Sequence, residues 1–148
     1  MDQKVLYIDM DNVLVDFKSA FPFIDKDILD QHPNDKENIP GIFALMIPMP
    51  NAIESFKKLA EKFDVYILST PPWDNPSGWS DKIEWVKKYL GETAHERLIL
   101  TQHKNLNQGD YLIDDALING AKEFKGELLH FGTEKFPDWN SVLIYFNL

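Results

Sequence analysis

Short apolar runs alternate along the chain with segments of helical periodicity. Each run holds three or four largely apolar residues between polar or turn-forming ones, which is typical of strands buried on both faces. The runs occupy residues 5–8, 65–68, 98–100, 111–113 and 128–131. Regular alternation of strands and helices predicts an α/β fold with a doubly wound, mostly parallel five-stranded sheet.

Helical spacing fills most of the intervals between these runs. Apolar residues recur three and four positions apart over residues 53–63, and Pro50 suits the first turn of that helix. A short helix is expected over residues 116–124, and Asp138 is expected to cap a last helix.

The interval between the second and third runs is expected to begin as a loop. Residues 73–79 are rich in Pro, Gly and Asn, which favour turns. Ser80 then resembles an N-cap and Gly91 a helix end. Ile83, Val86 and Leu90 lie on one face of such a helix and are expected to be buried.

Residues 17–49 break the alternation. Prolines punctuate the segment, and only residues 27–31 suggest a short helix. About thirty irregular residues are too many for a plain connection between a strand and a helix. We interpret the segment as a small cap or lid inserted after the first strand of one domain that spans residues 1–148; the alternative is a flap that covers the edge of the sheet.

Composition indicates a folded protein with one core. The chain has 148 residues, of which 44% are hydrophobic. No apolar run approaches the length of a membrane span and the N-terminus lacks the layout of a signal peptide, so we expect a cytoplasmic protein without membrane contact. No cysteine is present, which excludes disulfides and thiol catalysis.

The formal net charge of −9 argues against duplex nucleic acid as a partner, because a duplex requires a basic surface. It does not exclude a small anionic substrate, because a bound cation and one or two lysines can dominate the field of a pocket. The sequence leaves the oligomeric state open, and a homodimer is one option.

Polar side chains follow four of the five apolar runs. In a parallel sheet the carboxyl ends of the strands meet in one crevice, where crowded carboxylates are costly unless a cation lies between them. A hard cation such as Mg²⁺ prefers oxygen ligands, and a lysine and a hydroxyl beside it would complete a phosphate site. The residues are Asp9, Asp11, Thr70, Lys104, Asp114 and Asp115. Taken alone, Asp9 and Asp11 are equally compatible with ordinary turn residues.

These residues also resemble, in order, the four motifs of the haloacid dehalogenase (HAD) superfamily. The motifs are Asp9-Met10-Asp11-Asn12-Val13, Thr70 after an apolar strand, Lys104, and Asp114-Asp115. Within the superfamily the chain looks like the 5′(3′)-deoxyribonucleotidases. The stretches that carry this closer resemblance are residues 9–16, 40–43, 48–50, 100–104, 112–115 and 139–142.

The resemblance implies a phosphatase that acts on (deoxy)nucleoside monophosphates. Asp9 would be the nucleophile that forms an aspartyl-phosphate, and Asp11 the general acid and then the general base. Mg²⁺ would be held by the carboxylate of Asp9, the backbone carbonyl of Asp11, and Asp114 or Asp115. Thr70 and Lys104 would bind the phosphoryl oxygens.

One position departs from the family pattern. Relatives often place a second small hydroxyl residue after the threonine, but here Pro71 follows Thr70, and proline has no amide proton to offer to a phosphate. Ser69 precedes Thr70 and is expected to point to the other side of the strand.

For the leaving group, aromatic side chains of the lid are candidates to stack on a base, Phe17 and Phe43 first among them. The other candidates are Phe21, Leu45, Met46 and Trp73. Packing of the lid onto the core explains any one of these residues equally well. The four histidines are too scattered for a zinc site.

Three alternatives to a nucleotidase are open. A HAD phosphatase for another small phosphate ester would share every motif. A phospho-accepting receiver domain has a similar residue set, but its paired acids come first and its single phosphorylated aspartate later. A catalytically inactive binding module would not be expected to keep every catalytic position filled.

Overall fold

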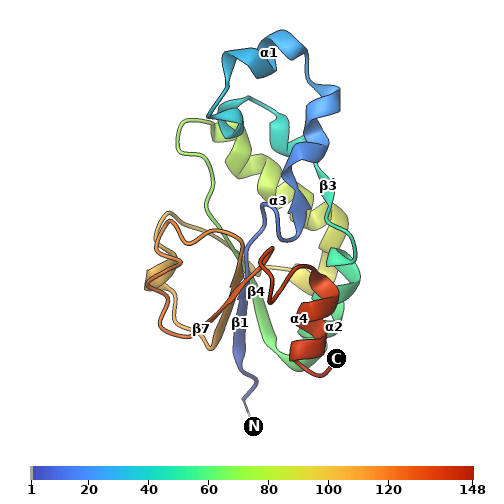
Figure 1. Ribbon diagram of the computed structural model, residues 1–148, viewed down its shortest axis with the longest axis vertical. Coiled ribbons are helices and arrows are strands. Elements are labelled where there is room, and N and C mark those ends of the chain that lie inside the picture. Colours follow the sequence, from blue (N-terminus) through green and yellow to red (C-terminus); the bar gives the residue numbers. More distant parts are fainter. Residues whose placement is uncertain (1) are drawn as a thin grey trace.

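The computed structural model, which describes residues 2–148, has a five-stranded sheet at its centre (Figure 1). Its strands are β1 (Val5–Ile8), β4 (Asp64–Ser69), β5 (Leu98–Leu100), β6 (Tyr111–Asp114) and β7 (Glu127–His130). All five are parallel, in the order β5-β4-β1-β6-β7, so the chain winds outward from the central strand in both directions. The predicted α/β fold with a doubly wound parallel sheet is confirmed, and each strand boundary lies within one residue of its predicted position.

Three helices cover one face of the sheet. They are α2 (Ala52–Lys62), α3 (Pro76–Leu90) and α4 (Trp139–Tyr145). Their buried side chains form a single core with Leu6 and Ile8, whereas Tyr7 belongs to a smaller cluster. Side chains alternate along a strand, so this smaller cluster lies on the opposite face of the sheet. Within residues 2–148, none of the helices combines the length and apolar character needed to cross a bilayer.

Irregular chain covers the opposite face. Ala121 and Phe124 pack there against Tyr7, Leu68 and Leu112. The helix predicted over residues 116–124 is wrong, because these residues form turns and bends. Asn119 and Gly120 both have positive φ angles, +54° and +84°, which no right-handed helix accommodates.

Helix α3 begins at Pro76, five residues before the start predicted from Ser80 as N-cap. Pro76 occupies its first turn, where the missing amide proton costs nothing, so residues 76–79 are helical rather than loop. The preceding Asn75 is fixed by tertiary contacts: its side-chain amide donates to the carbonyls of Glu37 and Ile39, at 2.9 and 3.1 Å. The burial prediction holds for Val86 and Leu90 but is wrong for Ile83, which is 41% exposed.

The predicted start is wrong for helix α2 and right for helix α4. Helix α2 starts at Ala52 after Asn51, whose φ is +63°, so Pro50 precedes the helix instead of opening it. Helix α4 begins at Trp139 and is capped, as predicted, by Asp138, which forms a capping box: its carboxylate accepts from the amide of Ser141 at 2.9 Å.

Residues 17–49 form a compact segment beyond the carboxyl ends of the strands, beside α3 (Figure 1). Its base is a two-stranded antiparallel pair, in which Val15 pairs with Pro48 and Asp16 with Ile47. The pair consists of β2 (Val15–Asp16), which precedes the segment, and β3 (Ile47–Pro48). The other elements of the segment are η1 (Phe17–Phe23), α1 (Lys26–Gln31), η2 (Lys36–Asn38) and η3 (Ile42–Leu45), where η denotes a 3₁₀ helix. The predicted short helix is therefore present as α1. Two further 3₁₀ helices follow α3 and β5: η4 (Gly91–Ala94) and η5 (Lys104–Leu106).

Trp139 ties the C-terminal helix to the loop that follows β1. Its indole is 1% exposed, and its Nε1 donates to the carbonyl of Val13 at 2.8 Å. The ring also packs on Phe131, with centroids 5.3 Å apart. Helix α4 therefore stabilises the loop after β1, which carries Asp9 and Asp11.

We expect Trp139→Phe to lower the free energy of unfolding by about 1–3 kcal/mol, because the substitution leaves the buried carbonyl of Val13 without its donor. Urea denaturation followed by circular dichroism measures this change. Trp73→Phe, at a side chain that is 76% exposed, is the control and should change stability by less than about 0.5 kcal/mol. Equal stability of the two variants would contradict the anchoring role of Trp139.

Candidate active site

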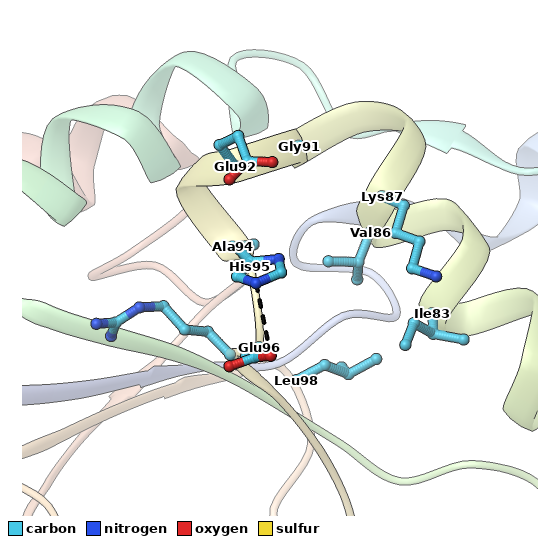
Figure 2. Close-up of a pocket in the computed structure, with 10 residues that line it drawn as sticks. Ile83, Val86, Lys87, Gly91, Glu92, Ala94, His95, Glu96 and Leu98 are labelled. Carbon is cyan, nitrogen blue, oxygen red and sulfur yellow. Dashed lines mark ion pairs between the residues drawn. The ribbon is translucent and has the colours of Figure 1, made fainter.

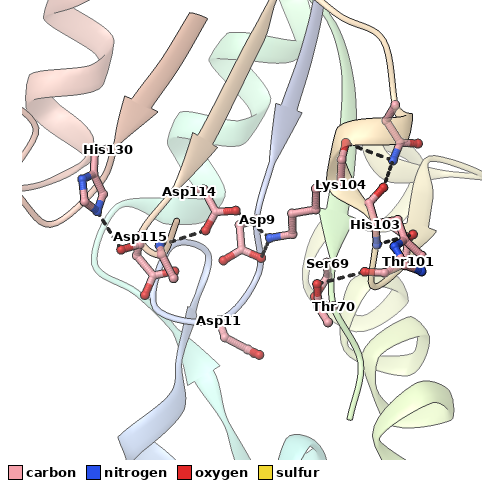
Figure 3. Close-up of polar contacts among 12 residues, drawn as sticks. Asp9, Asp11, Ser69, Thr70, Thr101, His103, Lys104, Asp114, Asp115 and His130 are labelled. Carbon is pink, nitrogen blue, oxygen red and sulfur yellow. Dashed lines mark hydrogen bonds and ion pairs between the residues drawn. The ribbon is translucent and has the colours of Figure 1, made fainter. Parts of the chain in front are cut away.

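The carboxyl ends of the parallel strands enclose a small polar cavity of about 160 Å³ (Figure 3). All six polar residues that follow the predicted strands line it. These are Asp9, Asp11, Thr70, Lys104, Asp114 and Asp115, joined by Asn12, Ala116, Ile118 and Asn119. The six predicted residues, up to 106 positions apart in the sequence, thus meet in one place.

A larger cavity, of about 550 Å³, lies beside the edge strand β5 and shares no lining residue with the first (Figure 2). Its wall is mostly apolar, from Ile83 and Val86 on α3 to Leu98 on β5. Its histidine, His95, is paired with Glu96 at 3.5 Å. Because it gathers no comparable set of reactive groups, we assign the chemistry to the smaller cavity.

The loop after β1 is shaped by its own backbone. The amides of Val13, Leu14 and Val15 all donate to the carbonyl of Met10, at 2.9–3.1 Å. Asn12 adopts a left-handed conformation with φ +61°, which asparagine tolerates better than most residues. This tight turn places the side chains of Asp9 and Asp11 in the wall of one cavity.

Lys104 lies between the acidic ends of β1 and β6. Its ammonium donates to Asp9 Oδ1 at 3.0 Å and to Asp114 Oδ2 at 2.6 Å, and the residue is only 4% exposed. The other oxygen of Asp114 accepts from the amide of Ala116 at 3.0 Å. One buried cation therefore bridges two buried carboxylates, and the binding of phosphoryl oxygens expected of Lys104 stays a prediction.

Asp115 completes the acidic group. One carboxylate oxygen from each of Asp9, Asp114 and Asp115 lies within 4.8 Å of the others. The backbone carbonyl of Asp115 accepts a hydrogen bond from His130 Nε2 at 2.9 Å, so this histidine braces the chain behind the site (Figure 3). No sequence pattern indicates that role of His130.

Burial dominates the electrostatics of the cavity. It raises the pKa of Asp9 to about 7, a rise that Lys104 opposes and that Asp114 and Asp11 reinforce. Burial and the neighbouring Asp9 raise the pKa of Asp115 to about 7 as well. Burial acts to lower the pKa of Lys104, but the charges of Asp9 and Asp114 outweigh it and raise that pKa. Ionised carboxylates here are therefore costly without more positive charge than Lys104 supplies.

We expect the metal-free protein to lose stability as the pH rises from 5 to 8. The pKa values of Asp9 and Asp115 are higher in the folded chain than in the unfolded one, so the folded state binds more protons between about pH 4 and 7. The melting temperature in EDTA should fall by several degrees, since about 1 kcal/mol corresponds to roughly 2–4 °C in a chain of this size. Asp9→Asn should reduce the slope. A melting temperature that rises over this range would contradict the assignment.

The donor set of the cavity fits a hard divalent cation. Three converging carboxylates offer only oxygen atoms, and burial raises the pKa values of Asp9 and Asp115, so a positive charge between them would stabilise their ionised forms. The carboxylate of Asp11 is not one of the three, because it turns toward α3. A contribution of Asp11 through its backbone carbonyl stays a prediction.

The hydroxyl groups of Thr70 and Ser69 form hydrogen bonds that the sequence did not predict. Thr70 lines the cavity, and its hydroxyl donates to the carbonyl of Thr101 at 2.9 Å. Ser69 is fully buried and does point away from the cavity, but it contacts Lys82, whose ammonium donates to Ser69 Oγ at 2.9 Å. Pro71 has no amide proton to offer, and its carbonyl accepts from Gln102 at 3.1 Å.

Lys82 is the polar residue of this region that sequence reasoning missed. Its ammonium donates to Asp11 Oδ2 at 3.1 Å, and the side chain is completely buried. The helical spacing of α3 marks only apolar positions as buried, so nothing in the local sequence distinguishes Lys82 from the exposed lysines around it.

The predicted lid aromatics pack against one another instead of lining the small cavity. Phe17 contacts both Phe21 and Phe43 edge to face, with centroids 5.9 Å apart in each pair. Phe43 is 3% exposed, whereas Phe17 is half-buried and Trp73 is largely exposed. Contact of Phe17 or Phe43 with a substrate stays a prediction.

Two solved structures share this architecture. A proposed HAD hydrolase, YfnB from Bacillus subtilis, whose crystal structure is bound to magnesium, matches the whole of both chains with a TM-score of 0.67 and 10% identity. SP0104 from Streptococcus pneumoniae, a haloacid dehalogenase-like hydrolase, matches 97% of this chain and 90% of its own with a TM-score of 0.57 and 15% identity. The fold is therefore that of the HAD-like hydrolases.

Sequence comparison identifies a family within the HAD-like hydrolases. Residues 26–136 match the model of the family described as 5′ nucleotidase, deoxy (pyrimidine), cytosolic type C protein. A proposed 5′(3′)-deoxyribonucleotidase of Vibrio phage KVP40 is 55% identical over 144 residues, which cover 97% of this chain and 85% of that protein. A similarly named protein of Bordetella bronchiseptica is 35% identical and covers 79% of this chain and 77% of its own length. The chain belongs to this nucleotidase family and is a HAD-type hydrolase for a small phosphate ester.

Proposed function

We propose that the protein is a Mg²⁺-dependent phosphomonoesterase that dephosphorylates deoxynucleoside 5′- or 3′-monophosphates through an aspartyl-phosphate. The observation that carries the proposal is the convergence of Asp9, Asp114, Asp115 and Lys104 in one buried cavity. Phosphoryl transfer depends mostly on positioning and charge neutralisation, which this arrangement supplies. The names of the relatives support a deoxyribonucleotide as the substrate.

In the first step a carboxylate oxygen of Asp9 attacks the phosphorus atom. The new Asp9 oxygen–phosphorus bond forms as the bond from phosphorus to the ester oxygen breaks. Asp11 donates a proton to that ester oxygen, so the nucleoside leaves as a neutral alcohol. Lys104 and Thr70 hold the non-reacting phosphoryl oxygens by charge and hydrogen bond.

In the second step a water molecule attacks the phosphorus atom of the aspartyl-phosphate. Asp11, now ionised, accepts a proton from this water, and the bond between phosphorus and Asp9 breaks. Inorganic phosphate leaves, Asp9 is again a free carboxylate, and Asp11 is again protonated. Water enters the reaction only as the second nucleophile.

Asp9, Asp114 or Asp115, and the backbone carbonyl of Asp11 would hold the metal ion. A bound Mg²⁺ supplies positive charge that neutralises the carboxylates and polarises a phosphoryl oxygen. The elevated pKa values of Asp9 and Asp115 support this placement, because both carboxylates must ionise in a buried space.

The nucleoside would lie under residues 17–49, which we propose act as the lid of the single domain. Phe17 is the candidate to stack on the base, a contact worth about 1–3 kcal/mol, and Phe43 would hold its ring from behind. The partly exposed surface of Phe17 supports this division of roles.

A substrate panel tests the proposal. The purified protein, with Mg²⁺ or with EDTA, is given deoxy- and ribonucleoside monophosphates, sugar phosphates and phosphoamino acids, and released phosphate is measured. We expect turnover of deoxynucleoside monophosphates that EDTA abolishes and added Mg²⁺ restores. Turnover of other esters alone would leave a HAD phosphatase of different specificity, and full activity in EDTA would contradict the metal requirement.

A further inference from the structure

Lys82 is a lysine with no exposed surface, in a chain whose other lysines on the same helix face solvent. Burying an ammonium group is costly unless hydrogen bonds and charge compensate for the lost water. The contacts of the Lys82 ammonium therefore indicate its role.

Three contacts surround the ammonium of Lys82. It donates to Asp11 Oδ2 at 3.1 Å and to Ser69 Oγ at 2.9 Å, and it lies 4.6 Å from the centre of the Phe43 ring. These partners come from the loop after β1, from the end of β4 and from η3. One side chain of α3 thus joins the acidic loop to the sheet and to segment 17–49.

The two oxygens of Asp11 have different surroundings. Lys82 holds Oδ2, whereas Oδ1 is buried and makes no hydrogen bond to any of residues 2–148. A buried acceptor without a partner is costly, so this oxygen is poised to meet a polar group from outside the chain. Asp11 also lines the small cavity, where such a group would lie.

We propose that Lys82 is a positioning residue that acts through Asp11: it fixes one oxygen of this carboxylate so that the other exchanges a proton with the leaving group and then with water. The inference rests on the proposed function. Ser69 orients the ammonium, and the ring of Phe43 closes it off from solvent. A misplaced acid group costs rate more than affinity, since the transition state is far more sensitive to its position than the bound ester is.

The test is a double-mutant cycle on phosphate release from a deoxynucleoside 5′-monophosphate, with Mg²⁺ present. Lys82→Met removes the charge and keeps most of the volume, and we expect kcat to fall about 10- to 100-fold with KM changed less than about threefold. In an Asp11→Asn background the same substitution should lower kcat less than about twofold, because Lys82 then has no proton-transferring group to position. Lys87→Met, at an exposed lysine of the same helix, is the matched control and should behave as wild type.

If Lys82→Met lowers kcat by the same factor in the wild-type and Asp11→Asn backgrounds, the inference is overturned and the role of Lys82 is purely structural. A rise in KM with kcat unchanged would lead to the same conclusion. If Lys82→Met does not fold, Ser69→Ala takes its place in the cycle, with an expected severalfold loss of kcat that disappears in the Asp11→Asn background. An equal loss there, or none, would also overturn the inference.

The same experiment separates this inference from the proposed function. A wild-type protein that releases no phosphate, or an Asp9→Asn variant that still does, would overturn the proposed function and the role of Lys82 with it. An inactive Asp9→Asn variant together with independent effects of Lys82 and Asp11 would overturn the role of Lys82 alone.

Discussion

Asp9→Asn is expected to reduce phosphate release below detection while the protein stays folded. Asparagine keeps the size of the side chain but lacks the carboxylate that forms the bond to phosphorus. The measurement is phosphate release from a deoxynucleoside monophosphate at saturating Mg²⁺. A rate near that of the wild type would contradict the role of Asp9.

The same substitution should raise the melting temperature of the metal-free protein at pH 8. At this pH the wild type holds Asp9 ionised in a buried site beside Asp114 and Asp115, and one of these repelling charges is removed. Asp27→Asn, at an exposed residue of α1, is the control and should alter neither activity nor melting temperature. Destabilisation of Asp9→Asn at pH 8 would show that the ion pair with Lys104 outweighs the repulsion.

Asp11→Asn is expected to slow turnover about 10²- to 10⁴-fold, the range typical of general acid–base catalysis. The amide cannot transfer a proton to the leaving oxygen or take one from water, while the nucleophile and the phosphate-binding groups remain. The loss should be larger with a deoxynucleoside monophosphate than with p-nitrophenyl phosphate, whose leaving group departs without protonation. Steady-state kinetics with both substrates measures the difference.

An Asp11→Asn variant within about twofold of the wild-type rate on the nucleotide would contradict the acid–base assignment. Equal losses on both substrates would place the role of Asp11 in the hydrolysis of the intermediate, since that step does not depend on the leaving group.

The sheet and the outline of its site could be predicted because both depend on local patterns. A run such as residues 65–68 is apolar enough to be a buried strand in any context, and parallel strands bring their carboxyl ends together by geometry alone. Thr70, Lys104 and Asp114 therefore line one cavity as expected from their positions after strands.

Two predictions about helices were wrong because backbone conformation and long-range contacts, which local sequence does not reveal, decide the structure there. Residues 116–124 contain apolar positions at helical spacing, but the left-handed Asn119 and Gly120 turn the chain so that Ala121 and Phe124 cover the sheet without a helix. The start of α3 depends on Asn75, whose amide is bound to carbonyls of a segment more than thirty residues earlier. No local rule contains that contact.

Lys82 and His130 could not be recognised because each acts across elements. Lys82 is buried by Phe43 and by its two hydrogen-bond partners, which lie 71 and 13 residues earlier in the chain. His130 contributes through the backbone carbonyl of Asp115. The reactive groups of the site follow from sequence, whereas the residues that hold them follow only from packing.

Covalent labelling shows whether Asp9 is the residue that forms a bond to phosphorus. The Asp11→Asn variant is mixed with radiolabelled p-nitrophenyl phosphate and Mg²⁺ and quenched in acid, and its peptides are mapped, since an aspartyl-phosphate that forms readily but hydrolyses slowly should accumulate. We expect label on the peptide that contains Asp9 and none in the Asp9→Asn, Asp11→Asn double variant. Label on another residue, or turnover without any labelled protein, would contradict this role of Asp9.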